Sequence, residues 1–120
     1  MGKPPKGVGP YPDTWHIPGG GVELGKESLI EALRREVKEE TNIEITDIIP
    51  IGFSEDREPN KHGEMTHYIF LNFKARYASG NSTAASDMSK LQWVPLHELK
   101  NLSLTRPSVP LFKRLGYLQR

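Results

Sequence analysis

The sequence contains no cysteine, which excludes disulfide bonds, zinc sites with thiolate ligands and catalysis by a thiol. No apolar run approaches the roughly 18 residues that a membrane-spanning helix needs, and nothing at the start resembles a signal peptide. Neither sign of charge dominates, since Lys and Arg number 16, Asp and Glu 15, and the net charge is +1. We therefore expect a cytoplasmic protein with no strong field for nucleic acid or a membrane surface.

The length of 120 residues supports one hydrophobic core and one domain. Residues 1–14 are rich in proline and glycine, a composition that predicts an N-terminal arm or loop and no inner strand. The folded domain is then expected over residues 15–120. Apolar residues make up 36% of the chain, which lies within the range of globular proteins.

The clearest helical pattern begins at Ser28, which matches a capping box together with Glu31. Apolar residues then recur at spacings of three and four, which predicts a helix; they are Leu29, Ile30, Leu33 and Val37. We expect the helix to end at residues 41–42, because Asn42 tolerates the left-handed conformation found after a helix.

Strand patterns occupy much of the remaining chain. They are expected at residues 14–17, at 43–55 with a break at Pro50, at 65–77 and at 90–96. The strongest is 65–77, where Ile69, Leu71, Phe73, Ala75 and Tyr77 share one face. A helical turn near residues 97–102 and a short helix within 107–118 follow. Strands around one or two helices predict an α+β fold or an α/β/α sandwich.

Three glutamates crowd within about one turn of the predicted helix: Glu36, Glu39 and Glu40. Like charges at these spacings destabilise a helix by a few tenths of a kcal/mol per pair. One interpretation is a solvated acidic edge, partly neutralised by Arg35 and Lys38. The other is a metal site, because a glycine-rich loop precedes the helix and can add a backbone carbonyl. Such hard oxygen donors suit Mg²⁺ or Mn²⁺.

Residues 21–43 resemble the Nudix box, G-x5-E-x7-R-E-U-x-E-E-x-G-U, in which U is aliphatic. Eight positions fall in register: Gly21, Glu27, Arg35, Glu36, Val37, Glu39, Glu40 and Ile43. The flanking segments "TWHIPGG" and "LQWVPLHEL" are also similar to Nudix sequences, so the resemblance covers residues 12–118. It implies an α/β protein, a Nudix-type α/β/α sandwich with a mixed β-sheet.

The chain departs from the Nudix pattern at three places. Asn42 replaces a glycine, and the loop "VELGKE" is one residue longer than usual, so the carbonyl of either Gly19 or Gly20 could face a metal. Nudix domains also carry a strand before the loop leading to Trp15, whereas Met1 falls inside that loop. We therefore expect a missing or truncated first strand, or a sheet completed in another way. An open edge would favour a homodimer or marginal stability.

The resemblance implies a metal-dependent pyrophosphohydrolase that uses water to attack phosphorus. Its substrate would be a nucleoside diphosphate linked to another moiety, such as ADP-ribose or another nucleotide sugar, or a nucleoside triphosphate. Pro59 lies near a proline typical of ADP-ribose pyrophosphatases. The alternatives are a Nudix-fold module that senses a nucleotide without cleaving it, which usually loses box glutamates, and an inactive fragment.

Carried over position by position, the resemblance assigns roles within the box. The metal ligands would be Glu36, Glu39, Glu40 and a carbonyl of Gly19 or Gly20. Arg35 would hold the glutamates in place, and Glu27 would pair with Arg35.

Other roles are expected outside the box or stay open within it. The general base could be a box glutamate, such as Glu39 or Glu36, or an acidic residue of a later loop, with Asp87 and Glu64 as candidates. Glu64 is also a candidate for substrate binding. Tyr11 and Trp15 could stack on a nucleobase, although packing within the protein would equally explain Trp15.

Overall fold

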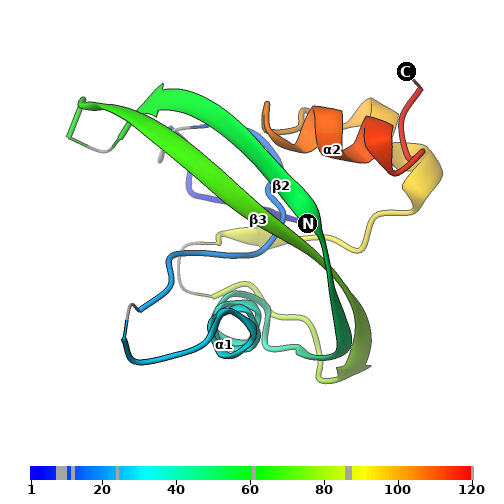
Figure 1. Ribbon diagram of the computed structural model, residues 1–120. Helices are drawn as coiled ribbons and strands as arrows, with labels where there is room; N and C mark the ends of the chain where they lie inside the picture. Colours follow the sequence, from blue (N-terminus) through cyan, green and yellow to red (C-terminus); the bar gives the residue numbers. More distant parts are fainter. Residues whose placement is uncertain (8–10, 12, 24, 61, 86–87, 120) are drawn as a thin grey trace.

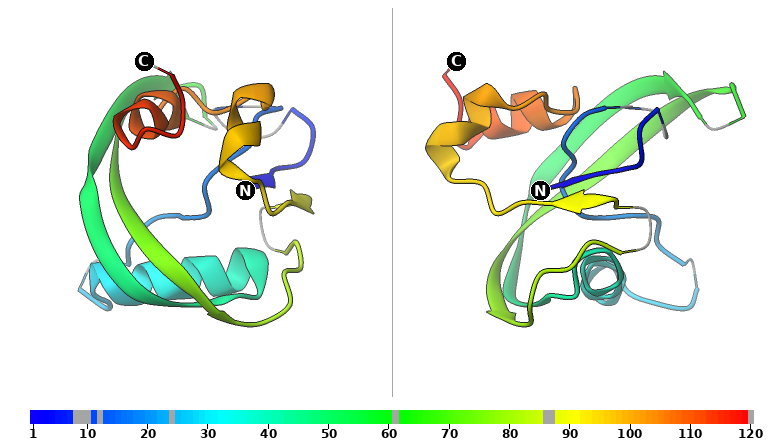
Figure 2. Two further views of the ribbon diagram at one scale, coloured as in Figure 1. Left: turned by 90° about the vertical axis from the view of Figure 1, so that its right-hand side faces the viewer. Right: turned by 180° about the vertical axis from the view of Figure 1, so that it is seen from behind.

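The computed structural model describes residues 1–7, 11, 13–23, 25–60, 62–85 and 88–119. Two long strands dominate it and form an antiparallel hairpin, with one α-helix on each side of the hairpin (Figures 1 and 2). This arrangement of helices and strands confirms the expected α/β class. The elements in chain order are β1 (Gly2–Lys3), α1 (Leu29–Thr41), β2 (Glu44–Pro59), β3 (Met65–Ser79), β4 (Lys90–Leu91), the 3-10 helix η1 (Leu96–Asn101) and α2 (Ser108–Arg114).

The strand β2 continues through Pro50, where the sequence predicted a break. The pairing with β3 runs from Glu44 opposite Ser79 to Pro59 opposite Met65. Register shifts interrupt this pairing, one of them between Pro50 and Gly52. Such an irregularity accommodates a proline, because proline has no N–H for the ladder. The predicted break is therefore a local bulge within one strand.

The prediction of an irregular arm over residues 1–14 was wrong for its first residues. Gly2 and Lys3 form β1, which pairs antiparallel with β4. Neither residue is a proline, so both have the N–H groups that pairing in a sheet needs. Gly2 also approaches β4 closely, since a Cβ at this position would lie 3.1 Å from Cδ2 of Leu91 and 3.2 Å from the carbonyl oxygen of Lys90. Gly2 thus permits a short strand, although the proline and glycine content of residues 1–14 predicted a loop.

The expected mixed sheet is not what the described residues form. Their two sheets, β1–β4 and β2–β3, are both antiparallel. The segment 14–17, expected as a strand, contributes two isolated bridges: His16 pairs with Gly2, and Trp15 pairs in parallel with Leu104. Parallel pairing is thus confined to one bridge in the described part of the chain.

The core divides between the two sides of the hairpin. Around α2 it is built on Leu99, Leu111 and Phe112. On the other side, α1 buries Ala32 and Val37 and borders a hollow of about 260 Å³ that also touches β3. The apolar residue Leu29, by contrast, is 45% exposed. No helix in the described ranges is long and apolar enough to span a bilayer.

Candidate active site

The helix that carries the glutamates has the predicted ends. The Ser28 hydroxyl accepts a hydrogen bond from the backbone N–H of Glu31, and the Glu31 carboxylate accepts one from the Ser28 N–H. At the other end Asn42 adopts the left-handed conformation, with φ of 61°. Both capping predictions are confirmed. The helix termini therefore fix the rotation and position of every glutamate between them.

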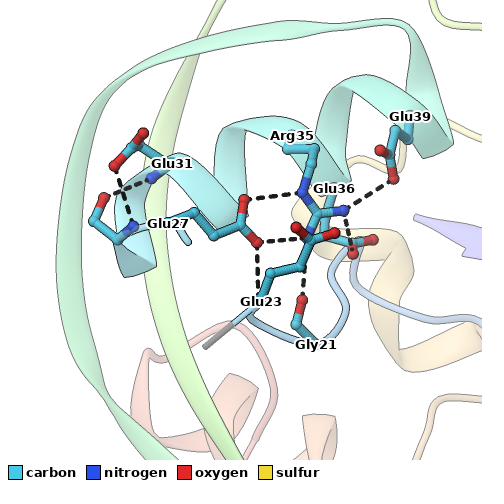
Figure 3. A network of polar contacts seen from close by, with 8 residues as sticks. Gly21, Glu23, Glu27, Glu31, Arg35, Glu36 and Glu39 are labelled. Carbon is cyan, nitrogen blue, oxygen red and sulfur yellow. Dashed lines mark hydrogen bonds and ion pairs between the residues drawn. The ribbon is translucent and has the colours of Figure 1, made fainter. Parts of the chain in front are cut away.

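Arg35 lies at the centre of the acidic cluster, as Figure 3 shows. Its Nε and Nη2 donate to the two carboxylate oxygens of Glu27, at 3.0 and 2.7 Å. Its Nη1 donates to Glu36 at 2.9 Å and to Glu39 at 3.2 Å. The same guanidinium reaches the carbonyl of Gly21 at 3.2 Å. One planar cation thus joins the glycine loop to three carboxylates of the box.

The pair between Arg35 and Glu27 has strong electrostatic consequences. The hydrogen bonds from Arg35 lower the pKa of Glu27 from its ordinary 4.5 to about 2, with help from the backbone N–H of Glu23. The hydrogen bonds to Glu27 in turn raise the pKa of Arg35. Both groups therefore stay ionised over the whole neutral range, and the loop is joined to the helix by a bidentate ion pair.

The glycine loop lies directly against two of the glutamates. The N–H of Gly19 donates to Oε2 of Glu40 at 3.0 Å, and Glu40 is only 3% exposed. A Cβ built on Gly20 would lie 2.5 Å from the carboxylate of Glu36. No such contact exists at Gly19 or Gly21, where a Cβ meets nothing within 4 Å. Gly20 is therefore the glycine of this loop at which an added side chain would collide with a box carboxylate.

These residues fit a divalent cation by their chemistry. Carboxylates on one rigid helix are hard oxygen donors, which Mg²⁺ and Mn²⁺ prefer. As they stand, no three Asp, Glu, His or Cys side chains in the described ranges are grouped closely enough to hold a metal. Arg35 explains this arrangement, because its guanidinium lies between Glu36 and Glu39 and neutralises both.

Of the two acidic candidates outside the box, the structure describes one. Asp87 falls outside the described residues. Glu64 precedes β3 in the hairpin turn, where its N–H donates to Asn60. The opposite end of the hairpin, where Glu44 pairs with Ser79, directly follows α1 in the chain. The structure therefore does not bring Glu64 together with the box glutamates, and its proposed role stays a prediction.

Tyr11 and Trp15 are both engaged with the protein. Tyr11 is 8% exposed, and its hydroxyl donates to Asp56 at 3.0 Å. Burial and the neighbouring carboxylate raise the pKa of this tyrosine. Trp15 is bridged to Leu104, and the ammonium of Lys3 lies 5.4 Å from its ring centroid. A role of either ring in stacking on a base stays a prediction.

Sequence reasoning missed an ion-pair cluster on β2. Arg106, which precedes α2, contacts Asp56 at 3.0 Å and also pairs with Glu58. Burial disfavours the charged form of Asp56, but the hydrogen bonds from Tyr11, the Arg57 amide and Arg106 outweigh it and lower the pKa. Alternation along "SEDRE" places Asp56 and Glu58 on one face of the strand. That pattern could have identified the pair, but not its distant partner.

Comparison with known proteins agrees with this geometry. A family model of the NUDIX domain matches residues 4–115. The chain is 32% identical over 116 residues to nucleoside triphosphatase NudI of Enterobacter sp. (strain 638), which covers 92% of this chain and 82% of that protein. It is 35% identical over 102 residues to nucleoside triphosphatase NudI of Klebsiella pneumoniae subsp. pneumoniae, covering 80% of this chain and 71% of that protein. For nucleoside triphosphatase NudI of Escherichia coli (strain K12) the identity is 33% over 102 residues, covering 80% and 72%.

Proposed function

This chain belongs to the Nudix family and is a hydrolase of phosphoric anhydride bonds, and from this premise we propose that it is a metal-dependent pyrophosphohydrolase of a nucleoside triphosphate. The observation that carries the proposal is the glycine loop on the box helix. Gly20 packs against the Glu36 carboxylate and the Gly19 N–H binds Glu40. The loop backbone therefore lies beside the carboxylates that would hold a cation in this proposal.

In this proposal Glu36, Glu39 and Glu40 would hold Mg²⁺ or Mn²⁺ together with a carbonyl of Gly19 or Gly20. A divalent ion supplies charge neutralisation of the phosphate oxygens and a lowered pKa of bound water. The chain's own residues supply position: the Arg35–Glu27 pair braces the loop against the helix. Arg35 can then release Glu36 and Glu39 while keeping its two bonds to Glu27.

The candidates for the general base are the box glutamates Glu36 and Glu39, and Asp87 and Glu64 outside the box. A box glutamate is favoured by position, because Glu39 is 49% exposed in its side chain and contacts only the edge of the Arg35 guanidinium. Asp87 and Glu64 remain the alternatives. A residue that acts only as base lowers kcat on removal of its charge without weakening metal affinity. Glu64→Gln and Asp87→Asn are therefore compared on both measurements, and if neither change lowers kcat by more than about fivefold, a box glutamate must serve as base.

The names of the relatives support one substrate class. Those compared are named nucleoside triphosphatases, which favours a triphosphate over ADP-ribose or another nucleotide sugar for this chain. The rival, a nucleotide sensor without turnover, is disfavoured because every box glutamate is present. The cytoplasmic location expected from composition stays a prediction.

A panel of nucleotides tests the proposal. Each nucleoside triphosphate, ADP-ribose and a nucleotide sugar are incubated with Mg²⁺, with Mn²⁺ or with a chelator, and phosphate, pyrophosphate and nucleoside monophosphate are quantified. We expect metal-dependent release of pyrophosphate and nucleoside monophosphate from a triphosphate. Turnover that persists in chelator would contradict the metal requirement. Binding of nucleotides without any turnover would favour the sensor.

A further inference from the structure

The segment of residues 80–85, which follows β3 and is called the capping loop below, binds the end of α1. The N–H of Thr83 donates to the carbonyl of Thr41 at 2.9 Å, and the N–H of Ala85 donates to the carbonyl of Glu40 at 3.1 Å. The last carbonyls of an α-helix have no partner within the helix itself. The capping loop therefore supplies donors to the end of α1 that carries Glu40, beside which it lies in Figure 2.

Asn42 adds a contact to the capping loop that a glycine could not make. Its backbone is left-handed, with φ of 61°, a conformation that glycine adopts more readily than asparagine does. Its side-chain Nδ2 donates to the carbonyl of Asn81 at 3.1 Å. Asparagine is thus the weaker residue for ending the helix. What it adds, relative to the glycine of the Nudix box, is the hydrogen bond to the capping loop.

The capping loop also fits closely against Asn42. A Cβ built on Gly80 would collide with the carbonyl oxygen of Asn42, so this approach requires a glycine. The carbonyl of Gly80 accepts a hydrogen bond from the Tyr77 hydroxyl at 2.6 Å. The start of the capping loop is therefore held between the end of β3 and Asn42.

Glu40 is held by two different loops. Its carboxylate accepts from the Gly19 N–H, and its backbone carbonyl accepts from the Ala85 N–H. Groups that orient a metal ligand raise the affinity of the site for the ion. Withdrawal of the capping loop would break the bond from Ala85 and loosen the backbone from which the Glu40 carboxylate extends.

We propose that Asn42 is a positioning residue for the divalent ion. By binding Asn81, it keeps the capping loop on the end of α1 and thereby fixes Glu40. The inference rests on the proposed function, because it requires that Glu40 binds the ion. Loss of a group that contacts a metal ligand directly costs about 10- to 100-fold in affinity. Asn42 acts one step further from the ion, so we expect an effect of about threefold to tenfold.

The variant Asn42→Gly tests the proposal, because it keeps the left-handed backbone and removes the amide. We expect the affinity of the full chain for Mn²⁺, measured by calorimetry, to fall by about threefold or more. The melting temperature without metal should stay close to that of wild type, since glycine suits this backbone and offsets the lost hydrogen bond. A merely structural role would leave the Mn²⁺ affinity of the folded protein unchanged, and that result would overturn the proposal.

Asp47→Gly is the matched control. Asp47 also has a left-handed backbone, with φ of 51°, but it lies on β2 and its carboxylate contacts Arg76. Replacing it by glycine should leave the Mn²⁺ affinity unchanged. An equal loss of affinity in Asp47→Gly and Asn42→Gly would overturn the proposal, because the effect would then not be specific to the capping loop.

Hydrogen exchange without metal supplies a second readout. The amides of Thr83 and Ala85 should exchange at least about threefold faster in Asn42→Gly than in wild type, because their bonds to α1 open more often. Unchanged protection of both amides would overturn the proposal, since the capping loop would then be held without Asn42. A wild-type protein that binds no Mn²⁺ would refute the metal site itself and the positioning role with it. Failure of this inference alone is distinguishable, because wild type and Asn42→Gly would then bind Mn²⁺ equally well.

Discussion

At the scale of single residues, one arginine organises the site. Arg35 neutralises Glu36 and Glu39 while it holds Glu27 by two hydrogen bonds. The repulsion between helix carboxylates is thus relieved by a cation of the chain itself. In our proposal a divalent ion takes over this role from the Nη1 group. We therefore expect metal binding to be most sensitive to changes at the contacts between the glycine loop and the glutamates of α1.

The first prediction concerns Glu40, which is buried and bound to the Gly19 N–H. Glu40→Gln keeps an acceptor for that N–H but loses the ligand charge. We expect kcat to fall by at least about 10²-fold, the scale of losing several kcal/mol of transition-state stabilisation. Circular dichroism should show an unchanged fold. Glu44→Gln, an exposed change just beyond the helix, is the control, and near-wild-type turnover in Glu40→Gln would contradict the assignment.

Gly20 gives a prediction with a built-in control. Gly20→Ala places a methyl group 2.5 Å from the Glu36 carboxylate, so this carboxylate must shift from its present position. We expect Mn²⁺ affinity, measured by calorimetry, to fall by about tenfold or more, the effect of displacing groups that support metal ligands. Gly21→Ala meets nothing within 4 Å and should bind Mn²⁺ nearly as wild type does. Equal effects of the two changes would refute the close-approach argument.

At the scale of elements, the sequence predicted the features that depend on neighbouring residues. It did not predict those that depend on contacts between residues distant in the chain. The ends of α1 were predictable because the capping interactions of Ser28, Glu31 and Asn42 involve backbone groups within about one helical turn. The hairpin strands were predictable from alternation. By contrast, β1 depends on Gly2 meeting β4, and the pair of Arg106 with Asp56 joins residues 50 apart in the chain. Contacts between residues so far apart produce no recognisable pattern in the sequence around either residue.

The same limit explains the burial pattern of α1. Periodicity predicted Ile30, Leu33 and Val37 as the core-facing residues. The structure buries Val37 but also Glu40 and Thr41, because the glycine loop contacts Glu40 and the N–H groups of residues 83 and 85 donate to the carbonyls of Thr41 and Glu40. The Gly19 N–H that binds Glu40 makes the burial of a carboxylate tolerable. The sequence pattern could place Glu40 near the loop, but not under it.

The ion pair between the loop and α1 predicts a pH dependence. The pKa of Glu27 is about 2 in the folded protein and 4.5 ordinarily, so the unfolded chain takes up the proton first as pH falls. The contribution of the pair to the free energy of unfolding is complete above about pH 4.5 and is lost toward pH 2. Glu27→Gln should therefore be less stable than wild type at neutral pH, and the difference should shrink between pH 4.5 and 2.

Urea unfolding at a series of pH values measures this difference. Glu64→Gln, an exposed carboxylate with no ion pair among the described contacts, is the control. A constant difference between Glu27→Gln and wild type across this range would show that the brace does not depend on the charge of Glu27.

At the scale of the whole molecule, few apolar side chains are deeply buried in the described part of the chain. No large side chain in the described ranges is fully buried, and several apolar side chains of the hairpin are more than half exposed, among them Phe53, Met65 and Ile69. Folding free energies are small differences between large terms. Ligands that bind only the folded state therefore shift the stability of such a protein visibly. In our proposal, bound metal acts in this way.

The central claim is that the glutamates of α1 hold the divalent ion, and thermal unfolding across a Mn²⁺ titration tests it most directly. The wild-type melting temperature should rise with metal concentration, because Mn²⁺ binds the folded state. A variant with Glu36, Glu39 and Glu40 all changed to Gln should show almost no rise, although it folds. If the triple variant responds to Mn²⁺ as strongly as wild type, the ion binds elsewhere and the account of this site is wrong.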